Sequence, residues 1–339
     1  MELFTLPFEK VLKWPFYDFI NVERDRKIGP KGPWNHKGGN FFMKSIVFKK
    51  LNAFSVNGSS GNPAGAVYLK NRGDLAPAEM QEIARELKGF VSEVGFVAGI
   101  DAGRYWIRYY SSEREVNFCG HATIAILYDL IRNSPELLAR KEVFIRTAKD
   151  ELAVENRIPA EDCVFIQAPR PAFRPFADDR ESLSGALGVE TGDIRGDLPV
   201  SVVNAGLETL IVPIVSLKRI LSVSPDLEGL KAYCVANGID IVTLYSGEVS
   251  FPSNRFRTRV FAPTFGYLED PATGSGNAAF GYYLLANRMT DGKPLSIEQN
   301  DSRDRPNIVK LSAREDEMGR YHVSFGGNAL VKFEGTYYL

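Results

Sequence analysis

Hydrophobic and polar residues follow two alternating patterns along this chain, one typical of strands and one typical of helices. Segments rich in aromatic and β-branched residues predict strands at Met43–Phe54, Ser92–Gly99 and Arg104–Tyr110. Apolar residues three and four positions apart predict a helix over Ala76–Lys88. The segment Gly120–Asn133 ("GHATIAILYDLIRN") is apolar on most sides, so it predicts a helix that other elements must surround.

The same order of elements recurs in the second half of the chain. The strand-like segment Arg255–Phe261 resembles Arg104–Tyr110, and each is followed by a loop, a glycine-containing junction and a mostly apolar helix. The second of these helices lies within Pro271–Leu285. Such a repeat predicts an α+β fold of two similar lobes, each a curled mixed or antiparallel sheet wrapped around a central helix. If the lobes face each other, the N-termini of the two central helices converge on one cleft.

The pattern also predicts where the chain divides. Residues 1–42 show no sustained period and lack the continuous apolar core of a signal peptide, so we interpret them as an extension that is not native to the domain, or as sequence upstream of the true start. Residues 43–157 are predicted to form the N-terminal lobe, joined by a last strand at about 328–339. Residues 158–327 are predicted to form the C-terminal lobe.

Composition narrows the class of protein. The 339 residues are 44% hydrophobic and 24% charged, as in soluble globular proteins, and the net charge of −1 argues against nucleic acid or an anionic membrane as the main partner. No apolar run is long enough to span a bilayer. The cysteines form neither a CxxC pair nor an even set, which fits the reducing cytoplasm. The three histidines lack metal-ligand spacing, so we expect no metal site.

The junction "EDPATGSGN", which begins at Glu269, allows two interpretations. Asp270 and Ser275 could cap the following helix by accepting hydrogen bonds from free backbone N–H groups. Alternatively, the small residues Gly274, Ser275 and Gly276 could let an anion reach those N–H groups and the positive end of the helix dipole. The junction alone favours the cap.

Several stretches resemble a known family: "NAFSVNGSSGNPAGAVYL", "SEVGFV", "EVNFCGHATIA", "VVNAGLETLIVP", "RVFAP" and "EDPATGSGNAA". They are similar, in the same order from about Lys44 to the C-terminus, to the signatures of the PhzF-like (phenazine biosynthesis) family. That family shares its fold with diaminopimelate epimerase and proline racemase. The resemblance implies two lobes with an active site between them, neither an organic cofactor nor a metal, and a homodimer.

Three polar residues are candidates for the chemistry. Glu93 is either an outward-facing charge on a half-buried strand or a cleft carboxyl whose pKa is raised by desolvation. The resemblance implies that it is the acid/base that moves a proton between carbons of the substrate. It also places His121 and Asp270 at the active site, where both would position the substrate. His121 could otherwise bond only nearby backbone. The family's polar neighbours of Glu93 are replaced here by apolar residues and glycine.

Other residues complete the predicted site. Gly120, Gly274, Ser275 and Gly276 would hold anionic oxygens of the substrate through fixed donors. Asn62 resembles the family's Gly-Asn-Pro turn near the cleft. Near the C-terminus, Asn300 stands where the family has glycine, so the backbone conformation of that turn could be altered.

Cys119 requires a separate interpretation. In the epimerase and racemase relatives, two cysteines act as opposed acid and base. Cys119 matches the first, and Ala272 stands where the second is expected, which disfavours inversion by two thiols. We interpret Cys119 as a small buried residue.

These observations lead to one main hypothesis: a cofactor-independent isomerase that acts on a small carboxylated metabolite, with Glu93 as acid/base. One alternative is a non-catalytic metabolite-binding protein on the same fold, because fold does not prove activity. A second is a one-cysteine epimerase or racemase that uses Cys119.

Overall fold

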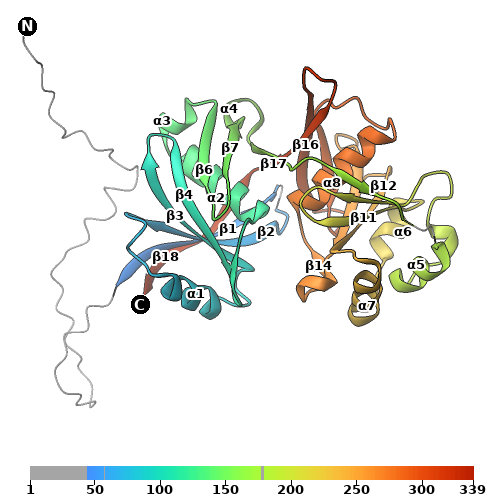
Figure 1. The fold of residues 1–339 in the computed structure, drawn as a ribbon, viewed down its shortest axis with the longest axis horizontal. Coiled ribbons are helices and arrows are strands. Elements are labelled where there is room, and N and C mark those ends of the chain that lie inside the picture. Colours follow the sequence, from blue (N-terminus) through green and yellow to red (C-terminus); the bar gives the residue numbers. More distant parts are fainter. Residues whose placement is uncertain (1–43, 57, 177–178) are drawn as a thin grey trace, which may run out of the picture.

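The computed structural model describes residues 44–56, 58–176 and 179–339, and Figure 1 shows its fold. The predicted extension, residues 1–42, lies outside the described residues. The helices are α1 Pro77–Glu86, α2 Gly120–Arg132, α3 Pro135–Leu138, α4 Ile158–Glu161, α5 Arg180–Leu187, α6 Leu217–Ser222, α7 Leu227–Asn237 and α8 Gly274–Ala286, with short 3₁₀ turns at Thr191–Asp193 and Pro263–Phe265. Among the described residues, no helix is long and apolar enough to cross a membrane.

The strands outnumber the helices and make the fold a mixed α+β one. Those of the first half are β1 Ser45–Ala53, β2 Asn62–Leu69, β3 Glu93–Asp101, β4 Arg104–Ser111, β5 Glu115–Val116, β6 Glu142–Arg146, β7 Glu151–Asn156, β8 Val164–Gln167 and β9 Ala172–Arg174. Those of the second are β10 Ser201–Asn204, β11 Glu208–Pro213, β12 Ile241–Ser246, β13 Phe256–Phe261, β14 Glu269–Asp270, β15 Leu295–Gln299, β16 Asn307–Glu315, β17 Tyr321–Gly327 and β18 Ala329–Tyr338. The strands and helices predicted above are confirmed, with ends that differ by at most three residues.

One pattern of strand pairing occurs twice. In the first half, β2 pairs in parallel with β3, β3 pairs antiparallel with β4, and β4 pairs antiparallel with β5 and parallel with β6. In the second half, β11, β12, β13, β14 and β15 repeat these pairings in the same order and directions. The chain therefore carries an internal repeat in its topology as well as in its sequence.

The two apolar helices occupy equivalent places in this repeat. Helix α2 packs against β1, β2, β3, β8 and β18, and α8 packs against β10, β11, β12, β16 and β17. All side chains from Ala122 to Ile131 are buried, as are those from Gly276 to Leu284, which explains why both helices are apolar on most sides. In Figure 1 the elements from β1 to β7 lie on one side of the molecule and those from β10 to β16 on the other.

The two ends of the described chain meet. Strand β18 pairs antiparallel with β1 along its length, from Ser45 opposite Tyr338 to Ala53 opposite Ala329. Strand β17 pairs with β8, so the chain passes from one side of the molecule to the other through neighbouring strands (Figure 1). This arrangement brings the start of β2, β3 and α2 close to the start of α8.

Candidate active site

Three polar side chains from the first half gather at one point. The Glu93 Oε2 atom lies 3.3 Å from His121 Nε2, and the Cys119 Sγ atom lies 3.5 Å from His121 Nδ1 and 3.9 Å from Glu93 Oε2. The side chains of Glu93 and His121 are 20% and 12% exposed, so both are largely withdrawn from water. A carboxylate and an imidazole in this arrangement can share or relay a proton.

Secondary structure explains why these residues meet. Glu93 is the first residue of β3 and lies opposite Ala64 of the parallel neighbour β2. Cys119 is the N-cap of α2, and His121 is in the first turn of that helix. Because α2 packs against β2 and β3, the start of the helix lies over the start of the strand.

Asp270 joins this group from the second half. Asn62 Nδ2 donates hydrogen bonds of 2.7 Å to Asp270 Oδ1 and to the backbone oxygen of Ala272. The Asp270 carboxyl interacts electrostatically with both His121 and Glu93. The structure therefore brings together four residues singled out from the sequence, namely Asn62, Glu93, His121 and Asp270.

The environment changes the proton affinity of three groups. Burial, reinforced by Glu93 and opposed by His121, raises the pKa of Asp270 to about 6. Burial lowers the pKa of His121, but the neighbouring Cys119 and Glu93 outweigh it and hold the pKa well above its ordinary value. Burial raises the pKa of the Cys119 thiol, which disfavours the thiolate. Groups able to hold a proton near neutrality thus surround Glu93.

The pKa of Asp270 leads to a pH-dependent prediction. Because its folded-state pKa lies above the unfolded value of about 3.9, the stability contributed by this carboxyl is lost as the pH rises towards 6. Asp270→Asn should therefore gain stability relative to the wild type, on the order of 1 kcal/mol, when the pH rises from about 4.5 to about 7.5. Urea unfolding at both pH values measures the change. Asp304→Asn, at an exposed site, is the control, and equal shifts in both variants would refute the assignment.

The N-termini of α2 and α8 share two features that fit an anion. Within the described residues, neither helix has a side-chain cap hydrogen bond, and neither has an acidic residue in its first turn. The first N–H groups of a helix have no partner within it, so they can bind an anion. Ser275 Oγ, in the first turn of α8, lies 3.2 Å from Thr273 Oγ1 and is half-buried.

A phenylalanine lies against both helix starts. A Cβ added at Gly274 would lie 2.2 Å from Cε2 of Phe325 in β17, and one at Gly120 would lie 3.3 Å from Cζ of the same ring. The two N-termini therefore converge. Packing against Phe325 also explains the glycine at 274, which sequence reasoning assigned only to anion access.

Alanine substitutions test this packing. Gly274→Ala should lower the free energy of unfolding by about 1–3 kcal/mol, because the buried Phe325 ring cannot move without disturbing the core. Gly120→Ala should lower the free energy of unfolding less, because its Cβ would lie 3.3 Å from the Phe325 ring and not 2.2 Å. Urea unfolding measures both. Adding Phe325→Leu should remove part of the penalty at Gly274, and a strictly additive double variant would contradict this explanation.

One sequence interpretation needs correction. Cys119 and Thr273 are the N-caps of the two equivalent helices, so Thr273, and not Ala272, occupies the place that matches Cys119. There is still no thiol at that place. Asn300 has a φ of 121°, a backbone conformation that glycine adopts readily, although the residue is not glycine.

The same cluster has the donor atoms of a metal site. The ligating atoms of Glu93, Cys119 and His121 all lie within 4.8 Å of one another. Carboxylate, thiolate and imidazole are zinc ligands, but the raised pKa of Cys119 opposes the thiolate form that zinc would need. The expected absence of a metal stays a prediction.

Sequence reasoning missed two residues at the site. Phe325 gives no local signal, because its role depends on the pairing of β17 with β8. Tyr267 lies just before β14, and the pKa of its hydroxyl is raised by partial burial of the residue, which is 41% exposed, and by the electrostatic effect of Asp270, Glu93 and Cys119. In the sequence, the only indication that Tyr267 lies near the site is its position three residues before Asp270.

Comparisons with known proteins show which family the chain belongs to. The model of the family described as phenazine biosynthesis-like protein (PhzC-PhzF) matches residues 51–335. An uncharacterized isomerase of Bacillus subtilis (strain 168) is 30% identical over 298 residues, 87% of this chain and 96% of the relative. The trans-2,3-dihydro-3-hydroxyanthranilate isomerase of Pseudomonas fluorescens is 27% identical over 294 residues, 85% of this chain and 98% of the relative.

A solved structure shows the same fold. The crystal structure of the PhzF-family phenazine biosynthesis protein of Bacillus anthracis matches with a TM-score of 0.75 at 26% identity, covering 87% of this chain and 99% of that one. The family match spans most of the chain, and the relatives are isomerases by name. The chain therefore belongs to the phenazine biosynthesis-like protein family, and it is an isomerase.

Proposed function

We propose that this isomerase moves a proton between carbons of a small carboxylated metabolite without a cofactor, with Glu93 as the acid/base. The observation that supports this most directly is the position of Glu93 Oε2, 3.3 Å from His121 Nε2 and within electrostatic reach of Asp270. A carboxylate in such a place can remove a proton from carbon and return it.

The proposed step is balanced within the substrate. The Glu93 carboxylate takes the proton from a C–H bond next to an activating group, and the electron pair of that bond moves into the substrate's π system. The same carboxyl then returns the proton to another carbon on the same face, so no oxidant, reductant or second substrate is needed. His121, with its raised pKa, and Asp270, held by Asn62, would position the substrate.

The helix starts would bind the substrate's negative charge. Backbone N–H groups of Gly120 at α2 and of Gly274, Ser275 and Gly276 at α8 are positioned where two uncapped N-termini converge. Donors fixed where charge develops contribute strongly to catalysis, about 3 kcal/mol for a single donor.

The proposal includes the organisation inferred from the sequence. Residues 43–157 with about 328–339 would form one lobe and residues 158–327 the other, each wrapped around α2 or α8, with the site between them. We further propose a homodimer that acts in the cytoplasm. Size-exclusion chromatography with light scattering tests the oligomeric state.

Exchange of substrate hydrogen with solvent deuterium tests the function. The first probe is trans-2,3-dihydro-3-hydroxyanthranilate, the compound named for the Pseudomonas fluorescens relative, followed by a panel of small carboxylic acids. Mass spectrometry should show a gain of deuterium with formation of an isomer. Carboxylates that bind, as seen by thermal stabilisation, but never exchange would favour the alternative of a non-catalytic binding protein.

The position of Cys119 favours a second candidate, a one-cysteine epimerase or racemase. Its Sγ atom lies 3.5 Å from His121 Nδ1, within reach of a base. We expect Cys119→Ala to keep proton transfer within about tenfold of the wild type, since a general base contributes 10²–10⁴-fold and this thiol is not proposed to be one. Exchange kinetics measure this. If Cys119→Ala lost as much of the exchange rate as a Glu93→Gln variant does, and if iodoacetamide inactivated the wild type, the cysteine mechanism would be favoured.

A further inference from the structure

A pocket lies next to the strand that carries Asp270. Its volume is about 390 Å³, within the range of small-molecule sites. The residues that line it come from the β1–β2 connection, from β14 and its end, and from the β15–β16 connection: Gly58, Ser60, Glu269, Pro271, Asn300, Asp301, Ser302 and Arg305. Neither Glu93 nor His121 is among them, although Glu269 and Pro271 flank Asp270. The pocket is therefore next to the active site but separate from it.

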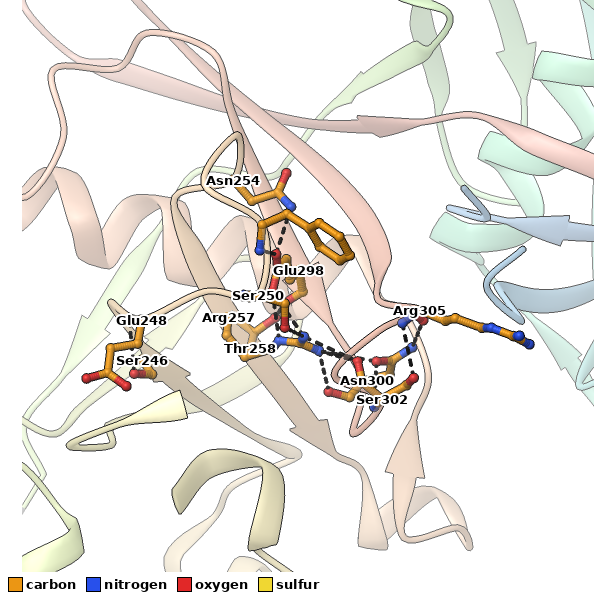
Figure 2. Close-up of polar contacts among 11 residues, drawn as sticks. Ser246, Glu248, Ser250, Asn254, Arg257, Thr258, Glu298, Asn300, Ser302 and Arg305 are labelled. Carbon is orange, nitrogen blue, oxygen red and sulfur yellow. Dashed lines mark hydrogen bonds and ion pairs between the residues drawn. The ribbon is translucent and has the colours of Figure 1, made fainter. Parts of the chain in front are cut away.

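A buried arginine fixes one wall of this pocket (Figure 2). Arg257 is fully buried, and its Nη1 atom donates to the backbone oxygens of Asn300 and Ser302 at 3.0 and 3.2 Å. Asn300 Nδ2 in turn donates to the backbone oxygen of Arg305 at 3.0 Å. These bonds hold the β15–β16 connection in one conformation, as a preorganised binding site requires.

A buried asparagine joins the other walls. Asn307 Oδ1 accepts from the backbone N–H of Gly61 at 2.8 Å, and its Nδ2 donates to the backbone oxygen of Pro271 at 2.7 Å. The side chain of Asn52 donates to the backbone oxygen of Ser60. The β1–β2 connection and the end of β14 are thus held next to each other by hydrogen bonds that do not involve a ligand.

Two oppositely charged residues that line the pocket, Asp301 and Arg305, differ from the third, Glu269, in having no partner among the described residues. Glu269 is neutralised by Arg259, with Oε2 and Nη2 2.6 Å apart. By contrast, the Asp301 carboxylate and the Arg305 guanidinium have no hydrogen-bond or ion-pair partner among residues 44–56, 58–176 and 179–339. Figure 2 shows the Arg305 side chain extending away from the Arg257 cluster, towards the blue ribbon of the first half.

We propose that this pocket binds a small zwitterion of the α-amino acid class. Arg305 would bind the carboxylate, Asp301 would bind the ammonium group, and the hydroxyls of Ser60 and Ser302 would complete the contacts. A simple carboxylate would be repelled by Asp301, and a simple amine would be repelled by Arg305. A molecule that carries both charges satisfies both residues, and charged hydrogen bonds are the strong ones.

Calorimetric titration of the full chain with each of the twenty common L-amino acids tests this proposal. At millimolar concentrations, at least one should bind. Its analogues without the amino group or without the carboxyl group should bind at least about tenfold more weakly. An analogue with a single charge that binds equally well would overturn the proposal, as would the absence of binding by every amino acid.

Substitutions locate the site. Arg305→Gln and Asp301→Asn should each weaken binding at least about tenfold. Arg303→Gln and Asp304→Asn, exposed in the same loop but outside the pocket lining, should not. Binding that is unaffected by both pocket variants would refute a separate site. Because the measurement is binding, failure here leaves the proton-transfer proposal untouched.

Discussion

Replacing Glu93 with glutamine is expected to slow solvent-deuterium exchange into the substrate about a thousandfold, the middle of the range for loss of a general acid/base. Glutamine keeps the size and shape of the side chain but cannot take up and return a proton. Mass spectrometry of the substrate in deuterium oxide measures the rate. Because Glu93 is 20% exposed and makes no ion pair with lysine or arginine among the described residues, the fold should tolerate the change.

Two comparisons make this result interpretable. Glu317→Gln removes a carboxylate at an exposed position of the β16–β17 hairpin, and it should exchange at the wild-type rate. Substrate affinity of the Glu93 variant, measured by calorimetry, should change much less than its rate. Exchange at the wild-type rate in the Glu93 variant would show that another group carries the proton.

The sequence allowed prediction of elements whose signals are local. The apolar helices α2 and α8 and the strands β4 and β13 each carry a clear pattern within a short segment. The sequence repeat indicated that the two halves share one order of elements, and the strand pairings of the two halves show the same order. No local pattern could indicate that β8 pairs with β17, because those strands are more than 150 residues apart.

The candidate site shows the same limit. Glu93, His121 and Asp270 were found through motifs that a resemblance made meaningful. Their distances depend on the packing of α2 over β2 and β3, and on the bond from Asn62 to Asp270 across 208 residues. The place of Phe325 and the pocket next to β14 arise from contacts between segments remote in sequence, and composition carries no information about such contacts.

Asn300 illustrates how a side chain can stabilise an unfavourable backbone conformation at its own position. Its positive φ of 121° is unfavourable for a residue with a side chain. Its Oδ1 atom accepts from Arg257 Nη1 at 3.3 Å and from the backbone N–H of Ser302 at 2.9 Å. The asparagine side chain thus stabilises a conformation that glycine would adopt at no steric cost.

Arg257 holds this turn through its bonds to Asn300, and we expect its loss to have a large effect on stability. Arg257 and Glu298 are both fully buried, with Nη2 and Oε2 3.0 Å apart. Burying an ion pair is unfavourable in itself, but removing one partner leaves the other charge poorly compensated, so Arg257→Met should lower the free energy of unfolding by about 3–5 kcal/mol. Urea unfolding measures the loss. Arg255→Met, two residues earlier and exposed, should stay within about 0.5 kcal/mol of the wild type.

The stability lost in Arg257→Met should depend on the buried charge of Glu298, which that variant leaves without its partner. Glu298 also accepts from the backbone N–H groups of Ser250 and Phe251 at 2.9 and 2.8 Å, and from Asn254 Nδ2 at 2.8 Å. Adding Glu298→Gln to Arg257→Met removes the unpaired charge and should recover part of the stability, because glutamine can still accept some of these bonds. If the double variant is less stable than Arg257→Met alone, the bonds that the Glu298 carboxylate accepts from Ser250, Phe251 and Asn254 would outweigh the cost of its unpaired charge, and the buried charge would not be the cause of the loss.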